Sequence, residues 1–174
     1  MESAFHPDGR SGMEPDEFDA WYEAAFARLV RQVYAMTGNE EEARDCVQEA
    51  FVRAWARRTR LDHSRSPDAW VRTTAYRLAV SRWRRRRMDH RAGDRSVGVK
   101  ESTDAPDETR VALVDALRTL PEAQRRAIVL HHIADLSLEE VAAETRAPVG
   151  TVKARLSRGR VALAAALAEG APHA

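Results

Sequence analysis

Apolar residues recur every three or four positions along most of the chain, which is the spacing of one face of an α-helix. The first such run starts near residues 15–17 and stops at Thr37-Gly38-Asn39. Asn39 and Glu42 then have the spacing of a capping box that opens a second helix, which Arg57–Arg60 would close. The apolar face is Phe18, Trp21, Ala25, Leu29 and Val33 in the first helix, and Ala43, Val47, Ala50, Phe51, Ala54 and Trp55 in the second.

A third helix is predicted over about residues 67–87. Ser66 and Pro67 suit its N-cap and first turn, and its last turn reads RWRRRR. The three helices together predict a first unit over residues 15–88, after a disordered tail over residues 1–14. The residues available to the core face of the third helix are Ala69, Trp70, Thr73 or Thr74, Leu78 and Val80.

Residues 89–108 contain Gly, Ser, Asp and Pro and almost no large apolar side chain, which is typical of a flexible linker. The helical pattern resumes over residues 109–169, with a helix before Pro121, one over residues 122–134, and two more on either side of Pro148. Ser137 and Glu140 form a second capping box. The expected inward positions are Val111, Val114, Leu117, Leu120, Ile128, Val129, Val141, Ala142, Val149, Val152, Leu156 and Leu163.

The composition agrees with an all-α fold of two small helical units joined by a flexible linker. Ala, Arg, Leu and Glu dominate, and aromatic residues make up only 6%. Cys46 is the single cysteine, which excludes an intrachain disulfide and a cysteine-based zinc cluster, and we expect no cofactor. No apolar run has membrane-spanning length and no signal peptide is recognisable, so we expect a cytoplasmic protein without a membrane segment.

The net charge of +1 hides a strong asymmetry along the chain. The net charge is −8 over residues 1–52, +10 over residues 53–95 and −1 over residues 96–174. A basic block of this kind is typical of a protein that binds a polyanion. Trp70, Tyr76 and Trp83 are expected to be exposed or half-exposed on this basic helix, and aromatic side chains stack on unpaired bases. The helix is therefore a candidate to hold single-stranded nucleic acid, with Trp70 as a plain core residue the favoured alternative for that position.

The stretch SLEEVAAETRAPVGTVKARLSRGR, residues 137–160, predicts a helix-turn-helix. Val152 and Leu156 would point to the core, which leaves the other side chains of the second helix free to enter a major groove. Backbone N–H groups at the start of that helix would suit a phosphate. The candidate residues for duplex DNA are Gly150, Thr151, Lys153, Ala154, Arg155, Ser157 and Arg158.

Three segments in order resemble bacterial RNA polymerase sigma factors of the extracytoplasmic-function (ECF) type. They are TGNEEEARDCVQEAFVRAWAR, SPDAWVRTTAYRLAVSRWRRRR, and the segment from LRTLPEAQRR to the helix-turn-helix, within residues 17–168. The resemblance implies transcription initiation with core RNA polymerase, promoter DNA and an inhibiting anti-sigma factor as partners. It implies polymerase binding by Asp45, Gln48, Glu49 and Arg53, −35 recognition by the residues named for duplex DNA, and −10 binding by Leu61, Asp62, His63, Arg65, Trp70, Arg77, Trp83, Arg84 and Arg85.

Several residues depart from the family pattern. The family often has Arg-Asn where this chain has Tyr76-Arg77, and Leu-Gly where it has Thr145-Arg146. A left-handed Arg146 would cost on the order of 1 kcal/mol. Since Ala154 and Ser157 are small, −35 specificity would depend largely on Lys153, Arg158 and DNA shape.

Two other classes of function compete with this one. An enzyme is disfavoured, because the sequence has no paired carboxylates in a cleft pattern, no phosphate-binding loop and no nucleophile motif. A stand-alone helix-turn-helix transcriptional regulator remains the alternative, although it would usually need a dimer interface to read two half-sites. Binding of an acidic inhibitor by the basic helix is compatible with a sigma factor.

Overall fold

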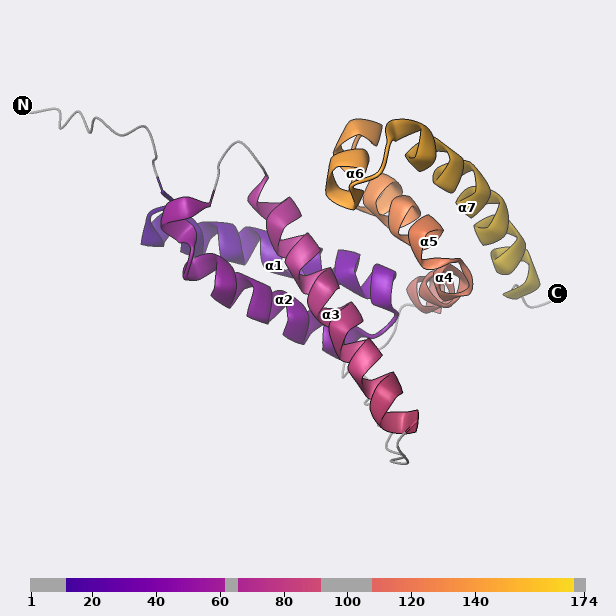
Figure 1. The fold of residues 1–174 in the computed structure, drawn as a ribbon, viewed down its shortest axis with the longest axis horizontal. Coiled ribbons are helices and arrows are strands. Elements are labelled where there is room, and N and C mark those ends of the chain that lie inside the picture. The colour runs from indigo at the N-terminus through magenta and orange to yellow at the C-terminus, as the bar shows by residue number, and fades with distance from the viewer. Residues whose placement is uncertain (1–11, 62–65, 92–107, 171–174) are drawn as a thin grey trace, which may run out of the picture.

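The computed structural model describes residues 12–61, 66–91 and 108–170, and all of its regular structure in these ranges is helical (Figure 1). This confirms the all-α fold class. The first unit contains α1 (Pro15–Thr37), α2 (Glu40–Trp55), the short helix η1 (Arg58–Arg60) and α3 (Pro67–Arg91). The second contains α4 (Glu108–Thr119), α5 (Glu122–Ile128), the π-helical turn η2 (Val129–Ile133), α6 (Leu138–Thr145) and α7 (Val149–Gly170).

Helices α1, α2 and α3 pack against one another in the first unit, and the predicted stripes of α1 and α2 fill its core. Trp55 is an exception, because it is 39% exposed and stacks under Arg58, whose guanidinium lies 4.2 Å from the ring centre. Met13, which the sequence pattern places in a disordered tail, is buried, and its N–H bonds to the Arg58 carbonyl at 3.0 Å. Residues 1–11 of that predicted tail lie outside the described residues.

The predicted core face of α3 was wrong by about one position. The structure buries Val71, Arg72, Ala75, Tyr76 and Ala79, whereas the six residues expected there are only half-buried. The reason is that α3 has neighbours on two sides: α1 and α2 cover one, and polar groups of the second unit meet Arg72 and Tyr76 on the other. A single stripe in the sequence cannot represent two buried faces.

In the second unit, α7 packs across α4, α5 and α6 with Val152 and Leu156 fully buried, as predicted. Gly159 lets α7 approach α5 closely, since a Cβ there would lie 2.9 Å from Ile128 Cγ1. The predicted capping box is present: the Ser137 hydroxyl accepts from the Glu140 N–H at 3.2 Å, and the Glu140 carboxylate accepts from the Ser137 N–H at 2.7 Å.

We expect Ser137→Ala to lower the free energy of unfolding by about 1 kcal/mol, because the Glu140 N–H at the start of α6 loses the hydroxyl that accepts its hydrogen bond. Urea unfolding followed by circular dichroism measures this change. Ser81→Ala, at an exposed position of α3, is the matched control and should change stability by less than about 0.5 kcal/mol. Equal effects of the two substitutions would contradict the role of the cap.

The two units lie in direct contact, an arrangement that the sequence left open. Helix α1 touches α4, α5 and η2. The buried apolar side chains of both units form one continuous cluster. The domain boundaries expected from the sequence, with a linker over residues 89–108, stay a prediction. Helix α3 runs into the first residues of that segment and ends at Arg91.

Candidate nucleic-acid and polymerase interfaces

The first candidate surface is the outward face of α7. Val152 and Leu156 anchor this helix inward, so Lys153, Ser157 and Arg158 project outward and are exposed. Gly150 and Thr151 are exposed in the first turn, and Ala154 and Arg155 are half-buried between the two faces. The structure therefore brings all seven residues predicted for duplex DNA onto one helix, and their contact with bases stays a prediction.

The turn before α7 has the strained backbone that the sequence raised as a question. Arg146 adopts the left-handed conformation, with φ 52° and ψ 44°, and its N–H closes the end of α6. The Ala147 N–H bonds to the Ala142 carbonyl at 3.1 Å, which completes a tight C-terminal turn. This turn sets the angle at which α7 leaves α6, at a cost of about 1 kcal/mol for a non-glycine residue.

The second candidate surface is a pocket of about 310 Å³ between α2 and α3. Arg53 and Arg57 line it from α2 and the residues just after it. Trp70, Thr74, Arg77 and Leu78 line it from α3, and the Arg57 guanidinium lies 5.9 Å from the Trp70 ring centre. Cationic donors beside an indole ring suit a flat, electron-rich ring that carries a phosphate.

Sequence reasoning found Trp70 and Arg77 but missed Arg57, Thr74 and Leu78 as members of this pocket. Thr74 and Leu78 follow Trp70 on α3 by four and eight positions, and Arg57 follows Arg53 by four positions, just beyond the end of α2. Residues at this spacing share a helix face. The i, i+4 relation was therefore the available signal, and only the packing of α2 on α3 shows that the two faces meet.

The basic end of α3 forms the third candidate surface. Arg84 and Arg85 are exposed, and Trp83 is 50% exposed. Two neighbouring arginines have a structural role instead, because Arg82 pairs with Glu49 at 2.6 Å and Arg86 pairs with Glu42 at 2.5 Å. These ion pairs attach the basic end of α3 to α2, while Arg84 and Arg85 are directed to solvent.

Some residues predicted to contact the −10 element are buried in the structure or lie outside the described residues. Leu61 is 8% exposed and belongs to the core, so its side chain cannot contact DNA in this conformation. Tyr76, expected as an exposed aromatic residue, is 6% exposed and faces the second unit. Asp62, His63 and Arg65 lie outside the described residues.

The four residues predicted to bind polymerase lie off the core face of α2, but they are not equivalent. Asp45 and Gln48 are exposed. Glu49 accepts from Arg53 at 2.5 Å and from Arg82 at 2.6 Å, so it connects α2 to α3. Arg53 also lines the α2–α3 pocket, which places it at the border between the two predicted surfaces.

Cys46 is fully buried in α2, and burial raises the pKa of its thiol to about 11. The thiolate is the reactive form, so Cys46 should react slowly with a thiol reagent at about pH 8 in the native protein and rapidly in denaturant. Absorbance assays with a chromogenic disulfide reagent measure both rates. Rapid reaction of the native protein would contradict the assignment of Cys46 to the core.

Metal binding and membrane insertion find no support in the described residues. No group of three or more His, Cys, Asp and Glu side chains there has the arrangement of a metal site. None of the described helices combines the length and apolarity needed to cross a membrane.

Comparison with known proteins bears on both units. The family model for Sigma-70 region 2 matches residues 21–88, and that for Sigma-70 region 4 matches residues 110–163. The ECF RNA polymerase sigma factor SigW of Bacillus subtilis is 32% identical over 151 residues, which cover 78% of this chain and 81% of SigW. The chain belongs to the ECF family of RNA polymerase sigma factors.

Other ECF sigma factors extend the similarity. EcfG of Rhodopseudomonas palustris is 32% identical over 148 residues, which cover 83% of this chain and 81% of that protein. The fold matches that of the sigma factor RpoE, solved in complex with the anti-sigma factor NepR from Bartonella quintana, with a TM-score of 0.74 and 24% identity over 90% of this chain and 99% of that one. In this ECF sigma factor, the α2–α3 pocket lies in the part that matches region 2 and the exposed face of α7 in the part that matches region 4.

Proposed function

We propose that this ECF sigma factor binds core RNA polymerase and directs it to promoters by contacting two DNA elements with two separate surfaces. The observation that supports the proposal best is the presence of two chemically different surfaces in one chain. The outward face of α7 suits the groove of a duplex, and the pocket between α2 and α3 suits an unpaired base. A factor that opens promoter DNA needs both.

At the −35 element, α7 would enter the major groove. Lys153 and Arg158 are long, exposed cations that can reach acceptor atoms on base edges or phosphates. Ala154 and Ser157 are small, so they would let the helix lie deep in the groove and contribute little direct readout. Thr151 and the N–H groups of the first turn would contact a phosphate.

At the −10 element, the pocket between α2 and α3 would receive a base extruded from the opened duplex. Extruding a base costs a few kcal/mol. Stacking on Trp70 and hydrogen bonds from Arg77 would offset that cost, while Arg84 and Arg85 at the end of α3 would hold the backbone of the separated strand. The exposed Asp45 and Gln48 on α2 would bind core polymerase on the neighbouring face.

This proposal makes the protein an initiation factor that works with RNA polymerase in the cytoplasm, not an enzyme in its own right. The region 2 and region 4 matches in one chain do not favour a stand-alone regulator. The similar fold of RpoE, a sigma factor bound to an anti-sigma factor in its solved complex, supports the proposal that a protein inhibitor also binds this chain.

Gel filtration with purified bacterial core RNA polymerase tests the proposed function. We expect the chain to co-elute with core enzyme and Asp45→Ala/Gln48→Ala to weaken that association by about tenfold, as for the loss of polar anchors at an interface. Glu169→Ala, exposed at the far end of α7, is the control. A chain that bound promoter duplex tightly and ignored core enzyme would be a stand-alone regulator.

A further inference from the structure

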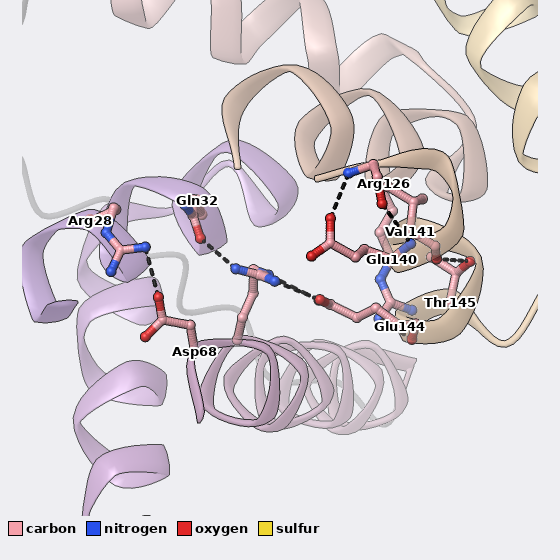
Figure 2. Close-up of polar contacts among 10 residues, drawn as sticks. Arg28, Gln32, Asp68, Arg126, Glu140, Val141, Glu144 and Thr145 are labelled. Carbon is pink, nitrogen blue, oxygen red and sulfur yellow. Dashed lines mark hydrogen bonds and ion pairs between the residues drawn. The ribbon is translucent and has the colours of Figure 1, made fainter. Parts of the chain in front are cut away.

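Helix α1 holds the first turns of α3 through polar side chains. The Asp68 carboxylate accepts from the Trp21 indole N–H at 2.8 Å, and its other oxygen pairs with the Arg28 guanidinium at 2.7 Å. One turn further along both helices, the Arg72 guanidinium donates to the Gln32 side chain at 3.0 Å. Figure 2 shows Arg28 and Gln32 directed from α1 toward α3. Directional contacts of this kind fix how the start of α3 lies against α1.

The same turns of α3 line the α2–α3 pocket with their other face. Trp70 follows Asp68 by two positions, which is about 200° around the helix axis. Trp70, Thr74 and Arg77 line the pocket, whereas Asp68 and Arg72, four positions apart, face α1. Contacts that fix the rotation of α3 about its axis from the α1 side therefore also fix where the Trp70 ring stands in the pocket.

The opposite side of the pocket is connected to the residues in front of α1. Arg57, which lines the pocket, directly precedes the η1 turn. The Met13 N–H bonds to the Arg58 carbonyl in that turn at 3.0 Å. A Cβ on Gly12 would lie 2.4 Å from Thr59 Cα, so the two backbone segments touch at a distance that only glycine permits. Any side chain at Gly12 would displace η1.

Aromatic rings connect this turn to α1 and then to α3. The Arg58 guanidinium lies 4.2 Å from the ring centre of Trp55. Phe18 of α1 meets the Trp55 ring edge-on at 5.1 Å and the Trp21 ring edge-on at 5.2 Å. Trp21 is in turn the donor to Asp68. An unbroken path of contacts therefore runs from the turn after α2, through α1, to the first turn of α3.

We infer that α1 and the residues just before it position the two sides of the −10 pocket, with Asp68 as the positioning residue for Trp70 and Gly12 as the positioning residue for Arg57. This inference rests on the proposed function of the pocket. Neither Asp68 nor Gly12 lines the pocket. They act through their neighbours, because a base can stack on Trp70 and meet the Arg57 guanidinium only if the spacing of these two groups is held.

A carboxylate in the first turn of a helix also stabilises the helix itself, because that end carries a partial positive charge. Asp68 occupies this place in α3. Arg28 separates the two roles, since Arg28→Ala keeps the Asp68 charge at the start of α3 and removes one of its partners on α1. The Arg28 side chain is 47% exposed, so its truncation leaves the core intact.

Capture of a base by the holoenzyme tests the inference. Core polymerase with this chain is titrated with forked DNA from a promoter that the parent holoenzyme transcribes, and with copies that carry one abasic site in the −10 strand. The abasic position that costs the parent most affinity marks the flipped base. The ratio of dissociation constants at that position, abasic over intact, measures base capture, and stacking on one aromatic ring accounts for roughly five- to 150-fold.

Asp68→Ala and Gly12→Ala should each lower this ratio about fivefold or more, toward the value for Trp70→Ala. Arg28→Ala should lower it less, and Asp19→Ala, at an exposed position of α1, should leave it unchanged. A variant that only folded less well would lose affinity for both DNAs equally and keep the parent's ratio. A parent-like ratio for Asp68→Ala, Gly12→Ala or Arg28→Ala would overturn the role given to that residue.

The indole N–H resonance of Trp70 in the free chain provides a readout that needs neither polymerase nor DNA. Trp70→Phe identifies this resonance among those of the four tryptophans. It should shift in Asp68→Ala and Gly12→Ala and stay in place in Asp19→Ala, and an unshifted resonance would contradict the positioning of Trp70. A parent holoenzyme that binds intact and abasic DNA equally would contradict the proposed role of the pocket, while the resonance would still test the contacts with α1.

Discussion

Replacing Lys153 with Ala is expected to weaken binding to the −35 element by about 1–3 kcal/mol. Transcription from −35-dependent promoters should then fall roughly five- to 150-fold. Lys153 is exposed on α7 one residue after the buried Val152, so it projects from the flank of the helix, roughly 100° around the axis from Val152. Truncating Lys153 removes both a hydrogen bond to an acceptor in the groove and the release of a counterion from the DNA.

The experiment compares two templates with the same polymerase. Run-off transcription from a promoter with both elements measures the effect, and a pre-melted template without a −35 element isolates the remaining steps. Lys153→Ala should give less transcript than the parent from the first template and the same amount from the second. Glu169→Ala should give the same amount as the parent from both templates. If Lys153→Ala transcribes the same promoters at the same levels as the parent, Lys153 does not contribute to −35 recognition.

Replacing Arg84 and Arg85 together with Ala is expected to reduce open-complex formation on the order of tenfold at about 0.1 M salt. Both side chains are exposed, whereas Arg82 and Arg86 are held by Glu49 and Glu42, so the double variant removes cations without breaking these ion pairs. Each lost contact with a single-strand phosphate lowers the salt slope by ~0.7, so the logarithmic slope should fall by about 1.4.

Two controls test whether the effect comes from lost charge, from altered side-chain shape or from weaker binding to core polymerase. Arg84→Lys/Arg85→Lys keeps both charges and should retain most of the salt dependence. Association of the Ala variant with core polymerase, measured by gel filtration, should stay within about twofold of the parent. Equal loss of polymerase docking and open-complex formation would mean that this end of α3 belongs to the polymerase interface and not to DNA.

Local features of the fold could be predicted from the sequence because they depend on neighbouring residues. The capping box at Ser137 and Glu140 involves residues three apart, and the inward Val152 and Leu156 follow from helical spacing. The strained Arg146 was raised as a question because a glycine is common at that position in the family, and the structure confirms its left-handed conformation.

Features that depend on distant contacts could not be predicted. Arg72 reads as an ordinary basic helix residue, and only Glu144, 72 positions away, explains its burial. Tyr76 was expected to be exposed or half-exposed on a basic helix, and nothing near it in the sequence indicates Glu122, which binds its hydroxyl in the structure. The α2–α3 pocket was recovered only in part, because Arg57 and Thr74 become pocket residues through the packing of two helices.

In vitro transcription with purified core RNA polymerase on a promoter library tests the central claim most directly. We predict that adding this chain makes core enzyme start at a defined set of promoters that share a −35 and a −10 element, and that Lys153→Ala and Arg84→Ala/Arg85→Ala each reduce that output. Core enzyme whose start sites are the same with and without the chain would contradict the account.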